Sequence, residues 1–200
     1  MADPASISGL SNHHHEEMNM NRFERIRRTV GWTLATAALI AAGACSTVDT
    51  TPAPRLRATD TVVVLPLANY TETPDAGSAA QSMAANALRK LGIATVDSMP
   101  ASPGGDPFDA TSQPDRDKAL GWARSHHARY ALSGAVEEWR YKVGVDGEPV
   151  VGMTFELRDV ESGKVVWSGT GNRGGWSRSS LGGVAQSLIG KLLSPLAARG

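Results

Sequence analysis

The thiol of Cys45 has the most distinctive chemistry in the chain, because Cys45 is the only cysteine among 200 residues. A thiol can be alkylated, oxidised or bound to a metal, but a sole cysteine cannot form an internal disulfide. Cys45 directly follows the small residues Ala42, Gly43 and Ala44. Small residues of this kind are typical of the cleavage site of an exported chain. The sequence therefore indicates a processing site at this thiol.

The residues before Cys45 have the composition of a secretion signal. Four arginines precede an uncharged, largely apolar run over 30–42. This run suits the apolar region of a signal peptide and is shorter than the about 20 residues that a membrane-spanning helix needs. We therefore predict a signal peptide over 1–44. Acidic residues and a histidine triplet precede the arginines, so Met18 or Met20 is the expected start.

The series Ala42-Gly43-Ala44-Cys45 resembles the bacterial lipobox, with Ala42 in place of the more usual leucine. The resemblance implies that the thiol carries diacylglycerol, that the chain is cut before Cys45, and that the new amine is acylated. Several acyl chains anchor a protein more firmly than one. Ser46 follows where an aspartate would favour the inner membrane, so we expect the outer membrane. A chance cysteine behind an ordinary cleavage site and a retained membrane anchor are the alternatives.

The segment after the cysteine is rich in Thr, Pro and Ala, which predicts a lipidated cysteine and flexible tether over 45–60. Residues 61–200 predict one periplasmic α/β domain with the order β-α-β-α-β-β-β-α and a mixed five-stranded sheet. Apolar runs and alternation indicate its strands, and apolar residues at helical spacing indicate its helices. The expected strands are 61–67, 93–96, 130–143, 151–158 and 164–170, and the expected helices are 78–91, 114–127 and 181–193.

Side chains with the spacing of a catalytic or metal site do not emerge from the domain. The adjacent His126-His127 follow Asp115 and Asp117 by about three helical turns, and fit a solvated helix end better than a metal site. The tandem carboxylates Glu137-Glu138 are expected on opposite faces of a strand, so they would not form a paired acid and base. The sequence also lacks a nucleophile elbow, a P-loop and zinc-ligand spacing. We therefore expect neither an enzyme nor a cofactor beyond the lipid on Cys45.

One of the five tryptophans, Trp176, stands out because it lies in an expected glycine-rich loop over 171–176. A large ring in such a loop has little core to fill, and exposed tryptophan suits membrane interfaces and partner contacts. Arg173 and Arg178 flank it, so we predict a membrane-facing rim with these cations near headgroup phosphates. Packing in the core is the favoured interpretation for Trp122, Trp139 and Trp167.

The chain is formally neutral, with 20 basic and 20 acidic residues, and removal of 1–44 leaves sixteen of each. Net charge therefore gives no argument for a nucleic-acid partner. Acids are nevertheless concentrated in places. Asp146 and Glu148 share one hairpin turn, and a weaker set follows the second expected strand. This weaker set is Asp97, Asp106, Asp109, Asp115 and Asp117.

Three segments, 62–77, 130–152 and 162–181, are similar to the lipoproteins of Pel exopolysaccharide export, the PelC family. The stretch WRYKVGVDGEP over 139–149 is the most specific part of the similarity. The opening segment is also similar to curli-secretion lipoproteins. The resemblance implies a compact α/β domain of the anticodon-binding-domain-like type. The loop over 97–113 lies outside the resemblance.

The resemblance implies a role in transport. Subunits would form a lipid-anchored homo-oligomeric ring, a dodecamer in the family, at the periplasmic face of the outer membrane. Acids around the ring, here Asp146 and Glu148, would form a funnel that guides a cationic amino-sugar polymer to an outer-membrane porin and so contribute to biofilm formation. The residues alone leave a second class of function open, a monomeric lipoprotein adaptor or activator of an envelope synthase or secretion channel.

Overall fold

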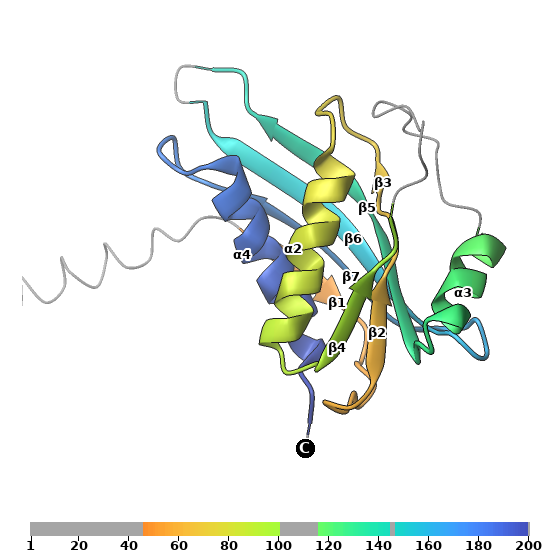
Figure 1. Ribbon diagram of the computed structural model, residues 1–200. Helices are drawn as coiled ribbons and strands as arrows, with labels where there is room; N and C mark the ends of the chain where they lie inside the picture. The colour runs from red at the N-terminus through yellow and green to blue at the C-terminus, as the bar shows by residue number, and fades with distance from the viewer. Residues whose placement is uncertain (1–45, 101–115, 145–146, 200) are drawn as a thin grey trace, which may run out of the picture. The chain divides into compact units, whose positions relative to one another are not determined.

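Seven strands form a single mixed sheet in the order β1-β7-β6-β5-β2-β4, with the short β3 paired to β5 beside this path (Figure 1). The structure is a computed structural model that describes residues 46–100, 116–144 and 147–199. Its strands are β1 (Ser46–Thr50), β2 (Thr61–Val64), β3 (Ala68–Asn69), β4 (Thr95–Ser98), β5 (Tyr130–Tyr141), β6 (Pro149–Asp159) and β7 (Val165–Gly174). Its helices are α2 (Ala76–Lys90), α3 (Arg116–Ser125), α4 (Leu181–Leu193) and the 3₁₀ turn Ser194–Leu196.

The half of the sheet around β2 is parallel, and the other half is antiparallel. β2 pairs in parallel with β4 and with the start of β5. Parallel neighbours require crossover connections, and α2 lies in the connection from β2 to β4. Val62, Val63 and Val64 are fully buried, as expected for a strand covered on both faces. β5, β6, β7 and β1 then pair antiparallel in succession.

Two helices cover one face of the sheet, and one helix covers part of the other. α2 and α4 pack on the same face (Figure 1). Their apolar side chains meet those of β5, β6 and β7 in the main core. α3 packs on the opposite face, where a second, smaller core joins Leu120 to Val63 and Ala131. Among the described residues, no helix covers this second face over β1, β7 and β6. We call that uncovered area the open face.

The expected α/β class with a mixed sheet is confirmed, but the described residues form seven strands rather than the expected five. The flexible tether is also wrong. Residues 46–50 form β1, which pairs with β7 along its whole length. Ser46, Val48 and Thr50 are half-buried while Thr47 and Asp49 are exposed, so even this polar strand alternates. Leu56 is 0% exposed within the main core. The Thr- and Pro-rich composition predicted a flexible segment, but its first residues are ordered by pairing with β7, which is far away in the sequence.

Several expected boundaries are also corrected. The second strand is Thr95–Ser98 rather than 93–96, and residues 171–174 belong to β7 rather than to a loop. α2 begins at Ala76 rather than at 78, and the preceding Asp75 has a left-handed backbone and makes no side-chain cap. Gly92, with φ at 91°, ends this helix as expected. None of the helices among the described residues combines the length and apolar character that a membrane span requires.

Candidate functional site

The first described residue, Ser46, lies directly opposite Arg173 in the β1–β7 ladder. The ladder continues to Thr50 opposite Gly169, so the start of β1 has a fixed place at one end of the sheet. Cys45 and the expected signal peptide lie outside the described residues. Ser46 is the residue that follows Cys45 in the sequence. The residue after the thiol-bearing cysteine therefore lies at the end of the sheet that carries Arg173.

Trp176 lies at this same end, immediately beyond β7, and its side chain is exposed. The turn that carries it is held by backbone bonds, from Gly175 N–H to the Pro149 carbonyl at 2.8 Å and from Ser179 N–H to the Trp176 carbonyl at 2.8 Å. A Cβ on Gly175 would lie 2.6 Å from Val184, so this turn requires glycine. Trp176 is 57% exposed, whereas Trp139 and Trp167 are 7% and 1% exposed. Core packing is thus confirmed for Trp139 and Trp167 and excluded for Trp176.

The other predicted members of the rim lie on the same loop or strand. Arg178 is exposed in the turn, and Arg173 is half-buried on β7. The neighbouring β5–β6 hairpin adds two exposed side chains, Tyr141 at 51% and Val143 at 99%. The Tyr141 hydroxyl accepts a hydrogen bond from the Leu181 N–H at 3.2 Å, which fixes the hairpin to the start of α4. We call this end of the sheet, defined by Ser46, Arg173, Trp176, Tyr141 and Val143, the anchor end.

The hairpin predicted to carry guiding acids is described only in part. Asp146 lies outside the described residues. The Glu148 carboxylate lies 3.2 Å from the Lys142 ammonium, and the two backbones are joined by a Lys142 N–H to Glu148 carbonyl bond at 2.8 Å. Both side chains are solvent-exposed, so this pair stabilises the fold little. It nevertheless partly neutralises the charge of Glu148.

The open face brings together acids that the sequence did not assign. β5 carries a bulge between Val136 and Glu138, where regular pairing with β6 shifts by one residue. The bulge turns Glu137 and Glu138 toward one hollow of about 600 Å³, so the expectation that they face opposite sides is wrong. The hollow is also lined by Thr47, Asp49, Arg140, Thr170 and Asn172.

Hydrogen bonds order the side chains of this hollow. Glu137 Oε1 accepts a bond from the Thr154 hydroxyl at 2.8 Å. Glu138 lies 2.9 Å from the Arg140 guanidinium and accepts a bond from the Asn172 amide at 3.1 Å. The ion pairs among the described residues include neither Asp49 nor Glu137. The hollow is therefore a polar surface with an excess of negative charge.

The weaker acidic set is not brought together with this hollow. Asp97 is exposed on β4, at the opposite edge of the sheet from β1, and Asp117 is exposed in the first turn of α3. Asp106, Asp109 and Asp115 lie outside the described residues. One signal in the sequence could have indicated the bulge that forms this hollow. The apolar residues Val136 and Trp139 are three positions apart and both are buried, whereas strict alternation would put them on opposite faces of the strand.

The expected helix-end histidines lie on the surface. His126 stacks on Trp122 with ring centroids 3.7 Å apart, and its Nδ1 lies 3.0 Å from the Trp122 carbonyl. Within the described ranges, no three side chains of His, Cys, Asp or Glu are grouped so that they could hold a metal ion.

No family model and no curated protein matches the chain. A solved structure does: the PelC dodecamer from Paraburkholderia phytofirmans, in space group P6, is 60% identical, with a TM-score of 0.69, over 78% of this chain and 100% of that chain. This chain belongs to the PelC family. A single-residue variant of the same PelC, also a dodecamer, matches at 61% identity with a TM-score of 0.69 over the same shares.

The PelC resemblance inferred from the sequence is thereby confirmed. The lipoprotein GNA1162 from Neisseria meningitidis is 18% identical, with a TM-score of 0.45, over 67% of this chain and 95% of that one. The solved PelC chains are matched along their whole length, so the described α/β unit corresponds to the entire chain crystallised as a dodecamer.

Proposed function

We propose that this chain is a lipid-anchored subunit of a periplasmic PelC ring that guides a cationic amino-sugar polymer to an outer-membrane porin and contributes to biofilm formation. The observation that carries the proposal is 60% identity over the full length of a PelC that forms a dodecamer. Closed rings arise when one subunit surface repeatedly contacts a different surface of the next. The homo-oligomer is the feature that separates this function from a monomeric adaptor.

The membrane attachment is proposed at the anchor end. Cys45 carries the lipid, and its bond to Ser46 keeps the acyl chains beside Arg173 and Trp176. An exposed indole with nearby guanidinium groups suits the headgroup region, where the ring is partly buried and cations meet phosphates. Several acyl chains contribute about 0.8 kcal/mol per buried CH₂, so they supply the attachment. Trp176, Arg173 and Arg178 then set the orientation of each subunit.

The polymer path is proposed along acids that recur in every subunit. Asp146 and Glu148 on the hairpin are the first set, and the acids over 97–117 are a weaker set. The hollow on the open face adds Asp49 and Glu137, which make no ion pair among the described residues. Exposed ion pairs contribute about 0–1 kcal/mol each, so a polymer is attracted without being held. A ring focuses such weak fields because it repeats each acid around one lumen.

The ring is tested by native mass spectrometry of the lipidated protein extracted in mild detergent. A mass of about twelve subunits supports the proposal, whereas a monomer at every concentration contradicts it and favours the adaptor function. A Cys45→Ser chain serves as the control for lipidation, because it should no longer incorporate labelled palmitate.

Charge reversal tests the polymer path separately from assembly. Asp146→Lys with Glu148→Lys, and Asp49→Lys with Glu137→Lys, should each reduce polymer export while the ring mass is retained. The matched control is Glu72→Lys with Glu161→Lys, which reverses two exposed acids outside both sets. Normal export by both acid pairs would contradict the acidic path.

A further inference from the structure

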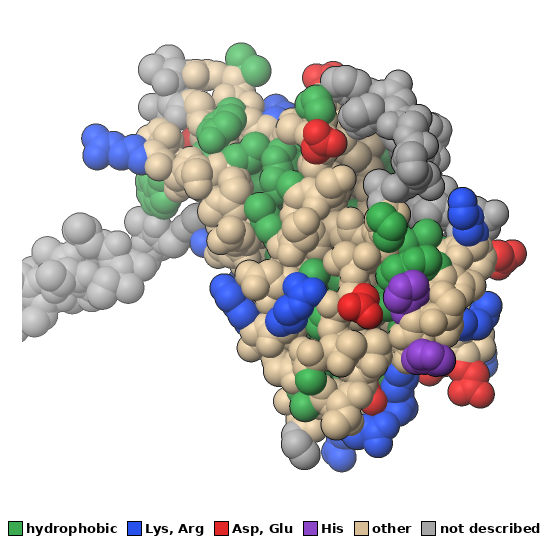
Figure 2. Space-filling model, in the orientation of Figure 1, with side chains coloured by type: hydrophobic (Ala, Val, Ile, Leu, Met, Phe, Trp, Pro, Cys, Tyr) green, Lys and Arg blue, Asp and Glu red, His purple; other side chains and the backbone are tan. Residues whose placement is uncertain are grey.

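The end of the sheet opposite the anchor end gathers basic side chains from four segments, and three of these segments are joined by hydrogen bonds. Backbone bonds join these segments: Arg199 N–H donates to the Leu56 carbonyl, and Ala198 N–H donates to the Leu91 carbonyl, both at 2.9 Å. The chain before β2, the end of α2 and the C-terminal residues therefore lie together (Figure 1). The six bases that they and the start of β5 contribute, here called the basic end, are Arg55, Arg57, Arg89, Lys90, Arg129 and Arg199. Figure 2 shows basic side chains gathered at the lower end of the molecule.

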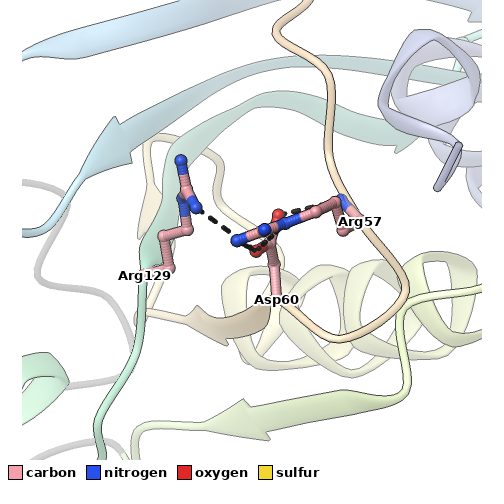
Figure 3. Close-up of polar contacts among 3 residues, drawn as sticks. All are labelled: Arg57, Asp60 and Arg129. Atoms are coloured by element: carbon pink, nitrogen blue, oxygen red, sulfur yellow. Dashed lines mark hydrogen bonds and ion pairs between the residues drawn. The ribbon is translucent and has the colours of Figure 1, made fainter. Parts of the chain in front are cut away.

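One buried carboxylate orders two of these guanidinium groups (Figure 3). Asp60 accepts bonds from the Arg57 N–H at 2.8 Å and from the Arg57 guanidinium at 3.2 Å, and it lies 3.6 Å from the Arg129 guanidinium. Its side chain is 3% exposed, whereas those of Arg57 and Arg129 are 65% and 48% exposed. The carboxylate therefore fixes both guanidinium groups and leaves their outer donors facing water.

The basic end carries more positive charge than the fold requires. Asp60 is shared by Arg57 and Arg129, and Asp159 also attracts the Arg129 guanidinium. Arg55, Lys90 and Arg199 are exposed and take part in none of the ion pairs among the described residues. Like charges held this close repel one another, so the arrangement is more stable with an anion bound. Fixed guanidinium forks match carboxylates in bidentate geometry at little entropic cost.

The position of the basic end decides between sources of anions. β5 is 12 residues long, so about 40 Å separates the two ends of the sheet at ~3.3 Å per residue. With the lipid at the anchor end, the basic end faces away from that membrane. A cationic polymer is repelled by it. With the anchoring membrane and the polymer excluded, the ligand that fits the basic end is a soluble anionic surface in the periplasm.

We propose that the basic end is a docking surface for an acidic segment of another envelope protein. The inference uses the membrane orientation of the proposed function, but not its acidic polymer path. Carboxylates of the partner would pair with the guanidinium groups that Asp60 holds in place. A ring presents the same surface many times, which raises the avidity for a repeated or multivalent partner.

The test uses the lipidated protein in phosphatidylcholine nanodiscs, with poly-L-glutamate as the probe. Arg55→Glu with Arg199→Glu reverses two exposed charges that do not contact Asp60. Arg124→Glu with Lys191→Glu is the control, because it makes the same charge change at exposed positions that belong neither to the basic end nor to the membrane-facing residues. We expect the first variant to weaken probe binding at least tenfold while the control binds as the unchanged protein does. Equal binding by both variants would overturn the proposal.

Two further measurements separate the alternatives. The unchanged protein and the Arg55→Glu with Arg199→Glu variant should bind vesicles that contain phosphatidylglycerol equally. Weaker vesicle binding by the variant would indicate that the basic end contacts a membrane, and it would overturn the proposal. Native mass spectrometry should give the same oligomer for both variants, and loss of the oligomer in the Arg55 variant would make the surface a contact between copies.

In cells, the Arg55 variant should lose polymer export while remaining lipidated. A monomeric unchanged protein would contradict the ring but leave the binding comparison intact.

Discussion

Ser46 and Arg173 are direct partners in the antiparallel ladder that joins β1 to β7. The expected lipid-bearing cysteine is therefore separated from the sheet by a single peptide bond. A flexible tether would let the domain move freely beneath the membrane. The observed pairing instead links Ser46, the residue after Cys45, to one end of the fold, where Trp176 is exposed.

Lengthening the connection between Cys45 and Ser46 should let the domain change its orientation relative to the membrane. We expect ten Gly and Ser residues inserted between Cys45 and Ser46 to leave lipidation intact and reduce the contact of Trp176 with lipid. A flexible linker of this length spans about 17 Å, at roughly 5–6 Å times the square root of the residue number. The measurement is the quenching of Trp176 fluorescence by brominated lipids. The Trp176 signal is the part of the fluorescence that is lost in the Trp176→Phe variant. The same insert in the β6–β7 turn, after Ser162, should leave quenching unchanged, and equal quenching in all three chains would contradict the coupling.

Two tryptophans should respond oppositely in stability and membrane contact. Trp167→Ala removes a ring that is 1% exposed and should lower the free energy of unfolding by about 3–5 kcal/mol. Trp176→Ala removes an exposed ring and should change it by less than about 0.5 kcal/mol while impairing export. Urea unfolding and an export assay check the pair. A large loss of stability in Trp176→Ala would show that the residue is structural.

Two glycines should also respond with opposite sign. A Cβ on Gly190 in α4 would meet nothing within 4 Å, so Gly190→Ala should stabilise the protein by about 0.5–1 kcal/mol through helix propensity. A Cβ on Gly134 in β5 would overlap the Thr154 carbonyl and lie 3.1 Å from Phe155, so Gly134→Ala should cost about 1–3 kcal/mol. Thermal and urea unfolding measure both. Destabilisation by Gly190→Ala would indicate that another surface approaches this helix closely.

Asp159 should make the stability depend on acid pH. Hydrogen bonds from the Ser162 N–H and hydroxyl, each at 2.8 Å, lower the pKa of its carboxyl group in the folded chain. A lowered folded pKa stabilises the protein fully above the unfolded value of about 3.9, and this contribution is lost as the pH falls through the folded pKa. The stability difference between the unchanged protein and Asp159→Asn should therefore be constant near neutral pH and shrink below about pH 4. Ser162→Ala should reduce this dependence, and an identical difference at pH 7 and pH 3 would contradict it.

Much of the fold could be predicted because its signals are local. Val62 to Val64 form a continuous apolar run, and Val151, Met153, Phe155 and Leu157 alternate with smaller or polar residues. Both patterns depend on side chains close in sequence, and both correspond to strands. β1 could not be found in this way, because Ser46 to Thr50 is polar and becomes a strand only by pairing with β7 more than a hundred residues later.

The candidate site could be predicted only where a residue was out of place in its local sequence. Trp176 stood out as a large ring among glycines, and it is exposed. The hollow on the open face was missed because strict alternation separates Glu137 from Glu138. The bulge that brings them together depends on the pairing with β6. Val136 pairs with Met153 and Glu138 pairs with Gly152, so Glu137 has no partner in this register. Asp49 was missed with the rest of β1.

The bulge at Glu137 also has an evolutionary consequence. It divides β5 into a first half that pairs in parallel with β2 and β3 and a second half that, among the described residues, pairs with β6 alone. Because the extra residue absorbs a change of phase, the second half can gain, lose or exchange residues without turning Leu132 or Val136 away from the core. An insertion or deletion in the hairpin beyond Trp139 would thus leave the register of the parallel half unchanged.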